Sequence, residues 1–179
     1  MYTPERCVAA LRFAAERHAA QKVPGTELPY LVHVTSVAAE VIAVLPETPD
    51  IDADFAVACA LLHDTIEDTA TSHADLVVAF GPRVADGVRA LSKSTSDELT
   101  KLERMTDSLR RIGQQPREVW MVKLADRITN LAPPPAFWTR DKCRSYRDEA
   151  VVIADALGGA SALLDARIRT RIAAYAAHC

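Results

Sequence analysis

The chain has 179 residues, of which 49% are hydrophobic and 25% are charged, the proportions of a globular protein with a substantial core. Its formal net charge of −3 excludes a general electrostatic attraction to nucleic acid, so we expect no nucleic-acid partner. No apolar run approaches the ~20 residues that span a bilayer and the N-terminus lacks an apolar signal core, so we expect no membrane partner either.

Helical signals follow one another along the chain, and no segment shows the sustained apolar–polar alternation of a strand. Clusters of proline, glycine and polar residues separate the helical segments. The expected helices cover residues 4–21, 33–45, 53–65, 72–81, 82–92, 97–113, 116–131, 139–157 and 161–177. The sequence therefore predicts a single all-α domain over residues 1–179, with the apolar helix 53–65 at its centre.

The helix 53–65 differs from the others because it runs into four ionisable residues, His63, Asp64, Glu67 and Asp68. If the helix continued, these side chains would fall within an arc of about 140°. Burying carboxylates beside an imidazole is unfavourable unless a cation compensates them, and adjacent His and Asp suit a divalent ion. A helix end that frays into a solvated acidic turn is the alternative, and this segment alone leaves both open.

Two other segments carry side chains of the same kinds. His33 stands at the start of an expected helix, where a capping or surface role is the commoner one. Asp126 and Asn130 are four residues apart on one face of the helix 116–131. By spacing alone, an ordinary surface ion pair between Asp126 and Lys123 or Arg127 is the better explanation of this second segment.

Taken together, the segments resemble the HD-domain phosphohydrolases. More closely, the chain is similar to the hydrolase domain of the Rel/Spo alarmone enzymes and to their stand-alone small alarmone hydrolases, which include the metazoan SpoT homologue. The matching blocks are His18-x-x-Gln21, Pro29-Tyr30-x-x-His33, Ala60–Thr69, Phe80-Gly81 and Val122–Leu131. They cover nearly the whole chain in order, and the resemblance implies an HD-domain helical bundle.

The resemblance also implies a metal centre and a reaction. The implied ligands are His33, His63, Asp64 and Asp126, around manganese (Mn2+) or another divalent metal. Glu67 and Asp68 take the general acid and base roles in the family. The implied enzyme is a guanosine-3′,5′-bis(diphosphate) 3′-pyrophosphohydrolase, which removes pyrophosphate from ppGpp or pppGpp and leaves GDP or GTP.

Three residues are expected to contact the nucleotide. The resemblance places Asn130 at the ribose and Tyr146 near the sugar or the 3′-diphosphate. Lys22 stands close to the position where the family has a basic residue, commonly arginine, while Val23 occupies the like-spaced position itself. A lysine lacks the bidentate, stacking guanidinium of arginine, which affects nucleotide affinity or base preference. His18 is expected on a helix surface, where it supports the loop that carries Lys22.

Two alternatives to alarmone hydrolysis stay open at this point. One is an HD phosphohydrolase acting on another ribose-phosphorylated nucleotide, such as NADPH. The other is a catalytically silent nucleotide-binding module that keeps the fold. The sequence leaves a homo-oligomer open, and four scattered cysteines without a Cys-x-x-Cys favour reduced thiols in a cytoplasmic protein.

Overall fold

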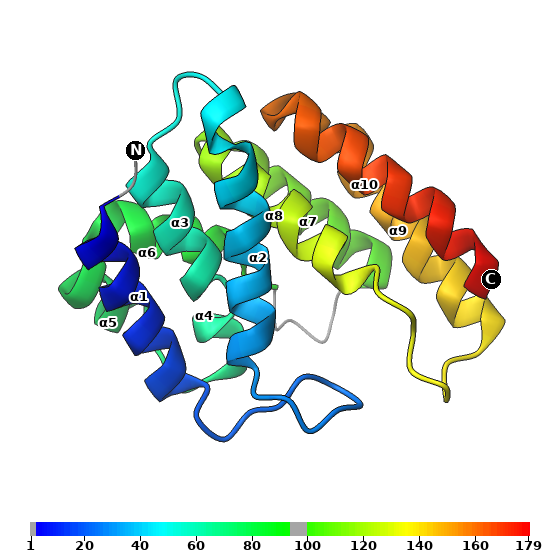
Figure 1. Ribbon diagram of the computed structural model, residues 1–179, viewed down its shortest axis with the longest axis horizontal. Coiled ribbons are helices and arrows are strands. Elements are labelled where there is room, and N and C mark those ends of the chain that lie inside the picture. The colour runs from blue at the N-terminus through cyan, green and yellow to red at the C-terminus, as the bar shows by residue number, and fades with distance from the viewer. Residues whose placement is uncertain (1–2, 94–99) are drawn as a thin grey trace.

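Every regular element in the chain is a helix (Figure 1), in a computed structural model that describes residues 3–93 and 100–179. The α-helices are α1 (Pro4–Arg17), α2 (Leu31–Val44), α3 (Ala53–Leu62), α4 (Thr65–Asp68), α5 (His73–Phe80), α6 (Pro82–Leu91), α7 (Lys101–Gly113), α8 (Arg117–Asn130), α9 (Arg140–Leu157) and α10 (Ala162–Tyr175). Short 3₁₀ turns follow three of them: η1 (Leu45–Glu47), η2 (Gly158–Ala160) and η3 (Ala176–His178). Over the described ranges β-structure is limited to an isolated antiparallel bridge between Lys22 and Pro29, so the all-α prediction is confirmed.

Helix starts follow the local capping chemistry. Ser72 accepts a hydrogen bond from the backbone of Asp75, whose carboxylate accepts one in return, and this capping box opens α5. Pro82 occupies the first turn of α6, where its missing N–H costs nothing. Thr100 and Glu103 form a second capping box and open α7. The expected helix 97–113 therefore exists from Lys101 onward, and residues 97–99 lie outside the described residues.

Helix α3 lies at the centre of the bundle, as its apolar composition predicts. All residues from Phe55 to Leu62 are buried, because α3 packs against α1, α2, α6 and α8. In Figure 1, α1, α5 and α6 lie on one side of α3, and the α9–α10 pair lies beyond α8 on the other. This arrangement brings the C-terminal end of α3 close to the first turn of α2 and to the C-terminal half of α8.

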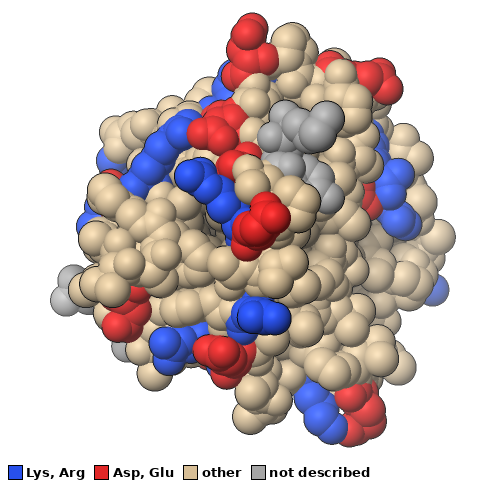
Figure 2. Space-filling view, turned by 60° about the vertical axis from the view of Figure 1, so that its left-hand side comes forward, with Lys and Arg blue, Asp and Glu red and all other residues tan. Residues whose placement is uncertain are grey.

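The molecular surface in Figure 2 carries acidic and basic side chains interspersed, without an extended area of one sign on that face. This mixture agrees with the formal net charge of −3. Among the helices of the described residues, none combines the length and the apolar character needed to cross a membrane.

Candidate metal centre

The chain turns sharply where α3 ends, and this turn positions the first two site residues. Contrary to the expected helix 53–65, α3 stops at Leu62, and His63 and Asp64 stand between it and the single turn of α4. The Thr65 hydroxyl donates to the Leu62 carbonyl at 2.7 Å, and the His63 ring lies with Nδ1 2.9 Å from the Ala60 carbonyl. These side chains satisfy carbonyl groups that a helix end leaves free, which stabilises the break.

The contact between His63 Nδ1 and the carbonyl has a consequence for the other ring nitrogen. Because Nδ1 donates its proton to the Ala60 carbonyl, the neutral form of the His63 ring, which is the form that binds a metal, has its free lone pair on Nε2 at the opposite edge. That nitrogen lies 2.9 Å from Oδ2 of Asp64 and 3.3 Å from Nε2 of His33, which enters from the first turn of α2. Two elements far apart in the chain thus aim three donor atoms at one point.

Asp126 reaches the same point from α8. Its Oδ1 lies 3.5 Å from Nε2 of His33 and 3.8 Å from Nε2 of His63. The Lys123 ammonium donates to the other carboxylate oxygen at 3.0 Å, and the Asn130 amide donates to Oδ1 at 2.5 Å. Because Lys123 and Asn130 are three and four residues away on the same helix, one face of α8 both supplies Asp126 and holds it in place.

These separations suit a divalent cation. The ligand atoms of His33, His63 and Asp64 all lie within 4.8 Å of one another, and Asp126 adds a fourth ligand atom, an oxygen close to both histidines. Ligands bonded to a small divalent ion at about 2.1 Å stand roughly 3 Å apart when they occupy neighbouring positions. Two imidazole nitrogens and two carboxylate oxygens form a donor set for a borderline metal. The residues present therefore fit a divalent ion.

The electrostatics of the cluster point the same way. Burial lowers the pKa of His33, but its contacts with Asp126 and Asp64 outweigh burial and raise that pKa to about 9. Burial raises the pKa of Asp64, yet the charge on His63 and hydrogen bonds from both histidines hold it well below its usual range. Burial also raises the pKa of Asp126, but the charge on Lys123 and the hydrogen bond from His33 outweigh burial and lower that pKa. Such a cluster favours positive charge at its centre, which a bound cation supplies.

A cavity of about 220 Å³ opens above these residues. Its lining includes the acidic residues of the centre and of α4, together with Asn130 and Tyr146. Glu67 accepts hydrogen bonds from the Lys93 backbone N–H at 2.8 Å and from the Lys93 ammonium at 2.5 Å. Asp68 accepts one from the Gln21 amide at 2.8 Å. The two carboxylates predicted for acid–base roles thus share one cavity with His63, Asp64 and Asp126, and each has its own neighbours.

Two residues that support the site carried no functional assignment in the sequence. The Tyr30 hydroxyl donates to Oδ2 of Asp64 at 2.6 Å, and the Tyr30 ring packs between those of His18 and His33. His18 is buried at 3% exposure, so the expectation of a surface position was wrong. It contacts Gln21 at 2.6 Å, and Gln21 in turn holds Asp68. The matching blocks that contain His18, Gln21 and Tyr30, just before His33, were the sequence feature that could have indicated the supporting roles of Tyr30 and His18.

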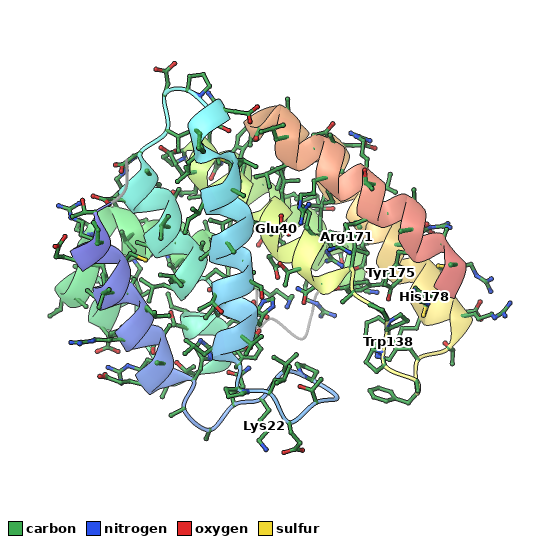
Figure 3. All side chains as sticks on the ribbon, in the orientation of Figure 1. Lys22, Glu40, Trp138, Arg171, Tyr175 and His178 are labelled. Carbon is green, nitrogen blue, oxygen red and sulfur yellow. The ribbon has the colours of Figure 1, made fainter. Side chains whose placement is uncertain are left out.

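Lys22 is the one predicted site residue that the structure brings neither to the cavity nor to the cluster of metal ligands. It pairs with Glu27 within its own loop, and Figure 3 shows it on that loop, directed away from the bundle. Tyr146, by contrast, lines the cavity, and its ring packs against Trp138, with centroids 5.2 Å apart. Asn130 also lines the cavity, although its amide is engaged with Asp126. The role assigned to Lys22 stays a prediction.

The fold and the site together define a class. An all-helical bundle that gathers a consecutive His-Asp pair, a second histidine and a second aspartate around one point is the arrangement that the resemblance to the HD-domain phosphohydrolases implied. Residues 10–172 match the family described as HD domain. The chain belongs to the HD domain family, as the resemblance implied.

Relatives within this family are similar over most of their length. The chain is 30% identical over 164 residues to the zebrafish (Danio rerio) guanosine-3′,5′-bis(diphosphate) 3′-pyrophosphohydrolase MESH1, covering 89% of this chain and 88% of that protein. It is 30% identical over 172 residues to the Drosophila melanogaster protein of the same name, covering 93% of each. A solved structure of a metazoan ortholog of SpoT, described as hydrolysing ppGpp, superimposes with a TM-score of 0.79 at 28% identity, covering 96% of both chains.

Proposed function

We propose that the chain hydrolyses ppGpp and pppGpp at the 3′-diphosphate, releasing pyrophosphate and GDP or GTP. The observation that carries the proposal is the convergence of His33, the His63–Asp64 pair and Asp126 beneath a cavity that also holds two further carboxylates. The names of the relatives agree with it, since the MESH1 proteins are 3′-pyrophosphohydrolases of guanosine-3′,5′-bis(diphosphate).

The metal ligands in this proposal are His33, His63, Asp64 and Asp126, and manganese is the ion that the family resemblance implies. When bound, the ion supplies Lewis-acid chemistry, which polarises a phosphoryl oxygen and makes water more acidic. The protein's own contribution is orientation. Ala60 sets the tautomer of His63, Tyr30 holds Asp64, and Lys123 and Asn130 hold Asp126.

Glu67 and Asp68 are the groups that we assign to proton transfer. Water attacks the phosphorus next to the ribose 3′ oxygen and loses a proton to a carboxylate, while the phosphorus–oxygen bond breaks and the 3′ oxygen receives a proton. Each carboxylate has a fixed position, because Lys93 binds Glu67 and Gln21 binds Asp68. A positioned general base or acid contributes about 10²- to 10⁴-fold to a rate.

The nucleotide itself is assigned to Asn130 and Tyr146, which line the cavity beside the metal ligands. Asn130 keeps one amide hydrogen and its carbonyl oxygen for a ribose hydroxyl while it donates to Asp126. Lys22 would have to leave Glu27 to reach a nucleotide. The four cysteines, all free in the structure, fit action in a reducing cytoplasm.

The test is product chromatography after incubation of the protein with Mn2+ and a panel of nucleotides. The expected result is GDP plus pyrophosphate from ppGpp, abolished by a chelator and restored by added metal. Release of inorganic phosphate from NADPH, with ppGpp left intact, would replace this proposal with the second phosphohydrolase hypothesis. Binding of ppGpp without turnover in the metal-loaded protein would instead indicate a silent module.

A further inference from the structure

A second cavity of about 140 Å³ lies between α7, α8 and α9, next to the cavity over the metal centre. The two share Lys93, Lys123, Arg127 and Glu149 in their walls, so they are neighbours rather than separate sites. Its volume has room for several water-sized groups. Its ionisable lining residues, among those that the structure describes, are Lys93, Lys101, Arg104, Lys123, Arg127 and Glu149. Cations therefore outnumber carboxylates in its wall.

Arg127 is the residue that this cavity leaves unexplained. It is 9% exposed, and its Nε and Nη1 have no hydrogen-bond partner within the described part of the chain. Its remaining nitrogen, Nη2, lies 3.8 Å from Glu149, a carboxylate that already pairs with Lys101. A buried guanidinium with two unmatched nitrogens is unfavourable unless a ligand completes it.

The neighbouring cations are already engaged. Lys93 is bound to Glu67, and Lys123 is bound to Asp126. The guanidinium of Arg127 lies over the ring of Tyr146, with Cζ 4.2 Å from the ring centroid. This cation–π contact holds the guanidinium beside Tyr146, and a planar fork of N–H donors matches the oxygens of a phosphate group.

We propose that this cavity is a second anion subsite, in which Arg127 binds the 5′-diphosphate of the nucleotide whose 3′-diphosphate reaches the metal centre. The inference rests on the proposed function, because that substrate carries two diphosphate arms on one ribose. One arm meets the divalent ion. The other arm needs a separate cationic pocket beside Tyr146, and the Arg127 cavity adjoins the metal cavity through shared walls.

The kinetic test compares ppGpp with guanosine 3′-diphosphate, which lacks the 5′ arm. Removing a charged hydrogen-bond partner weakens binding by about 10- to 100-fold. Arg127→Gln is therefore expected to raise KM for ppGpp by about that factor while KM for guanosine 3′-diphosphate stays unchanged. Arg127→Lys, which keeps the charge without the fork, should recover part of the loss. An equal rise in KM for both substrates would show a merely structural role and overturn the proposal.

A matched control removes a charge of the same kind on α7. Arg110 pairs with Asp107 on the surface and lines neither cavity, so Arg110→Gln should leave KM unchanged for both substrates. Thermal unfolding of each variant separates loss of fold from loss of binding.

A binding test without metal separates this proposal from the proposed function. Calorimetric titration of chelator-treated protein with GDP, which carries the 5′-diphosphate alone, should give an affinity that Arg127→Gln lowers by about 10-fold or more. If wild-type protein hydrolysed no alarmone but bound GDP through Arg127, the proposed function would fail and the subsite would stand. GDP binding that is indifferent to Arg127 would remove the subsite even in an active enzyme.

Discussion

The Tyr30 hydroxyl donates a hydrogen bond of 2.6 Å to Oδ2 of Asp64, an aspartate that we assign to the metal centre. Burial and the negative charge of Asp64 hold the pKa of Tyr30 above its usual range, so the hydroxyl keeps its proton at neutral pH and remains a donor. Oδ2 is also the oxygen that faces both histidines. Tyr30 therefore sets the direction in which Asp64 presents its oxygen to an ion.

Tyr30→Phe tests this relationship. The ring would keep its packing between His18 and His33, while Asp64 would lose a donor. Loss of a partner that orients a metal ligand costs about 10- to 100-fold in metal affinity. Competition with a chelator of known affinity measures the change. Tyr175→Phe is the control, because Tyr175 is a buried tyrosine at the C-terminal end of α10 that contacts none of the metal ligands and does not line the cavity. Equal metal affinity in wild type and Tyr30→Phe would contradict the role.

The ligand assignment is tested by removing one ligand at a time. His63→Ala or Asp64→Ala should leave the purified protein without stoichiometric metal, because each takes away a donor that lies within 4.8 Å of the others. Elemental analysis after gel filtration gives the metal content. His73→Ala is the matched control, since His73 also contacts an aspartate, Asp86 at 2.9 Å, but lies at the start of α5. Retention of full metal by the His63 and Asp64 variants would refute the centre.

The pH dependence of metal binding follows from His33. Its pKa of about 9 means that the metal-free protein holds a proton there at neutral pH, and an ion must displace it. Apparent metal affinity should thus rise with pH up to about pH 9, by at least about tenfold per pH unit, because the pKa of His63 is also raised and that ring too must lose its proton. Titration calorimetry across this range measures the slope. An affinity that did not vary with pH would show that no proton is displaced.

The same pKa predicts the opposite trend for the metal-free fold. Since the pKa of His33 is raised from 6.5 to about 9, its contribution to stability is complete below pH 6.5 and is lost as pH rises through 9. Urea unfolding of chelator-treated protein should therefore show stability that falls with pH over this window. Metal-loaded protein should not show this fall.

Much of this architecture could be predicted from local chemistry. The capping box at Ser72 and Asp75, the proline at Pro82 and the apolar composition of α3 each act over a few residues, so the sequence displays them directly. The end of α3 could not be placed, because its break depends on side chains that bond backward to Ala60 and Leu62. Residues 53–65 contain no glycine or proline that would indicate the end of the helix.

The site divides in the same way. Its metal ligands could be predicted because the blocks resemble those of a known family, whereas spacing alone favoured a surface ion pair for Asp126. The support from Tyr30 and the unmatched nitrogens of Arg127 depend on contacts between remote helices, which no local pattern displays. The interaction of Lys22 with Glu27 is local, but nothing in the sequence tells whether the Lys22 ammonium pairs with Glu27 or with a phosphate group.

Glu67 and Asp68 can be separated experimentally, because different residues hold them. Glu67→Gln keeps the size of the side chain and its contact with the Lys93 backbone N–H, yet it cannot accept a proton from water. Asp68→Asn makes the same change beside Gln21. The variant that removes the general base should keep its metal and lose about 10²-fold or more in kcat, with little change in KM. Single-turnover kinetics with ppGpp, together with metal analysis, identify it.

Lys93→Met is the control for the position of Glu67, because it removes the ammonium that binds this carboxylate. If the loss in kcat had the same pH dependence in Lys93→Met as in Glu67→Gln, Lys93 would act through Glu67. Undiminished turnover in both carboxylate variants would exclude these residues from proton transfer.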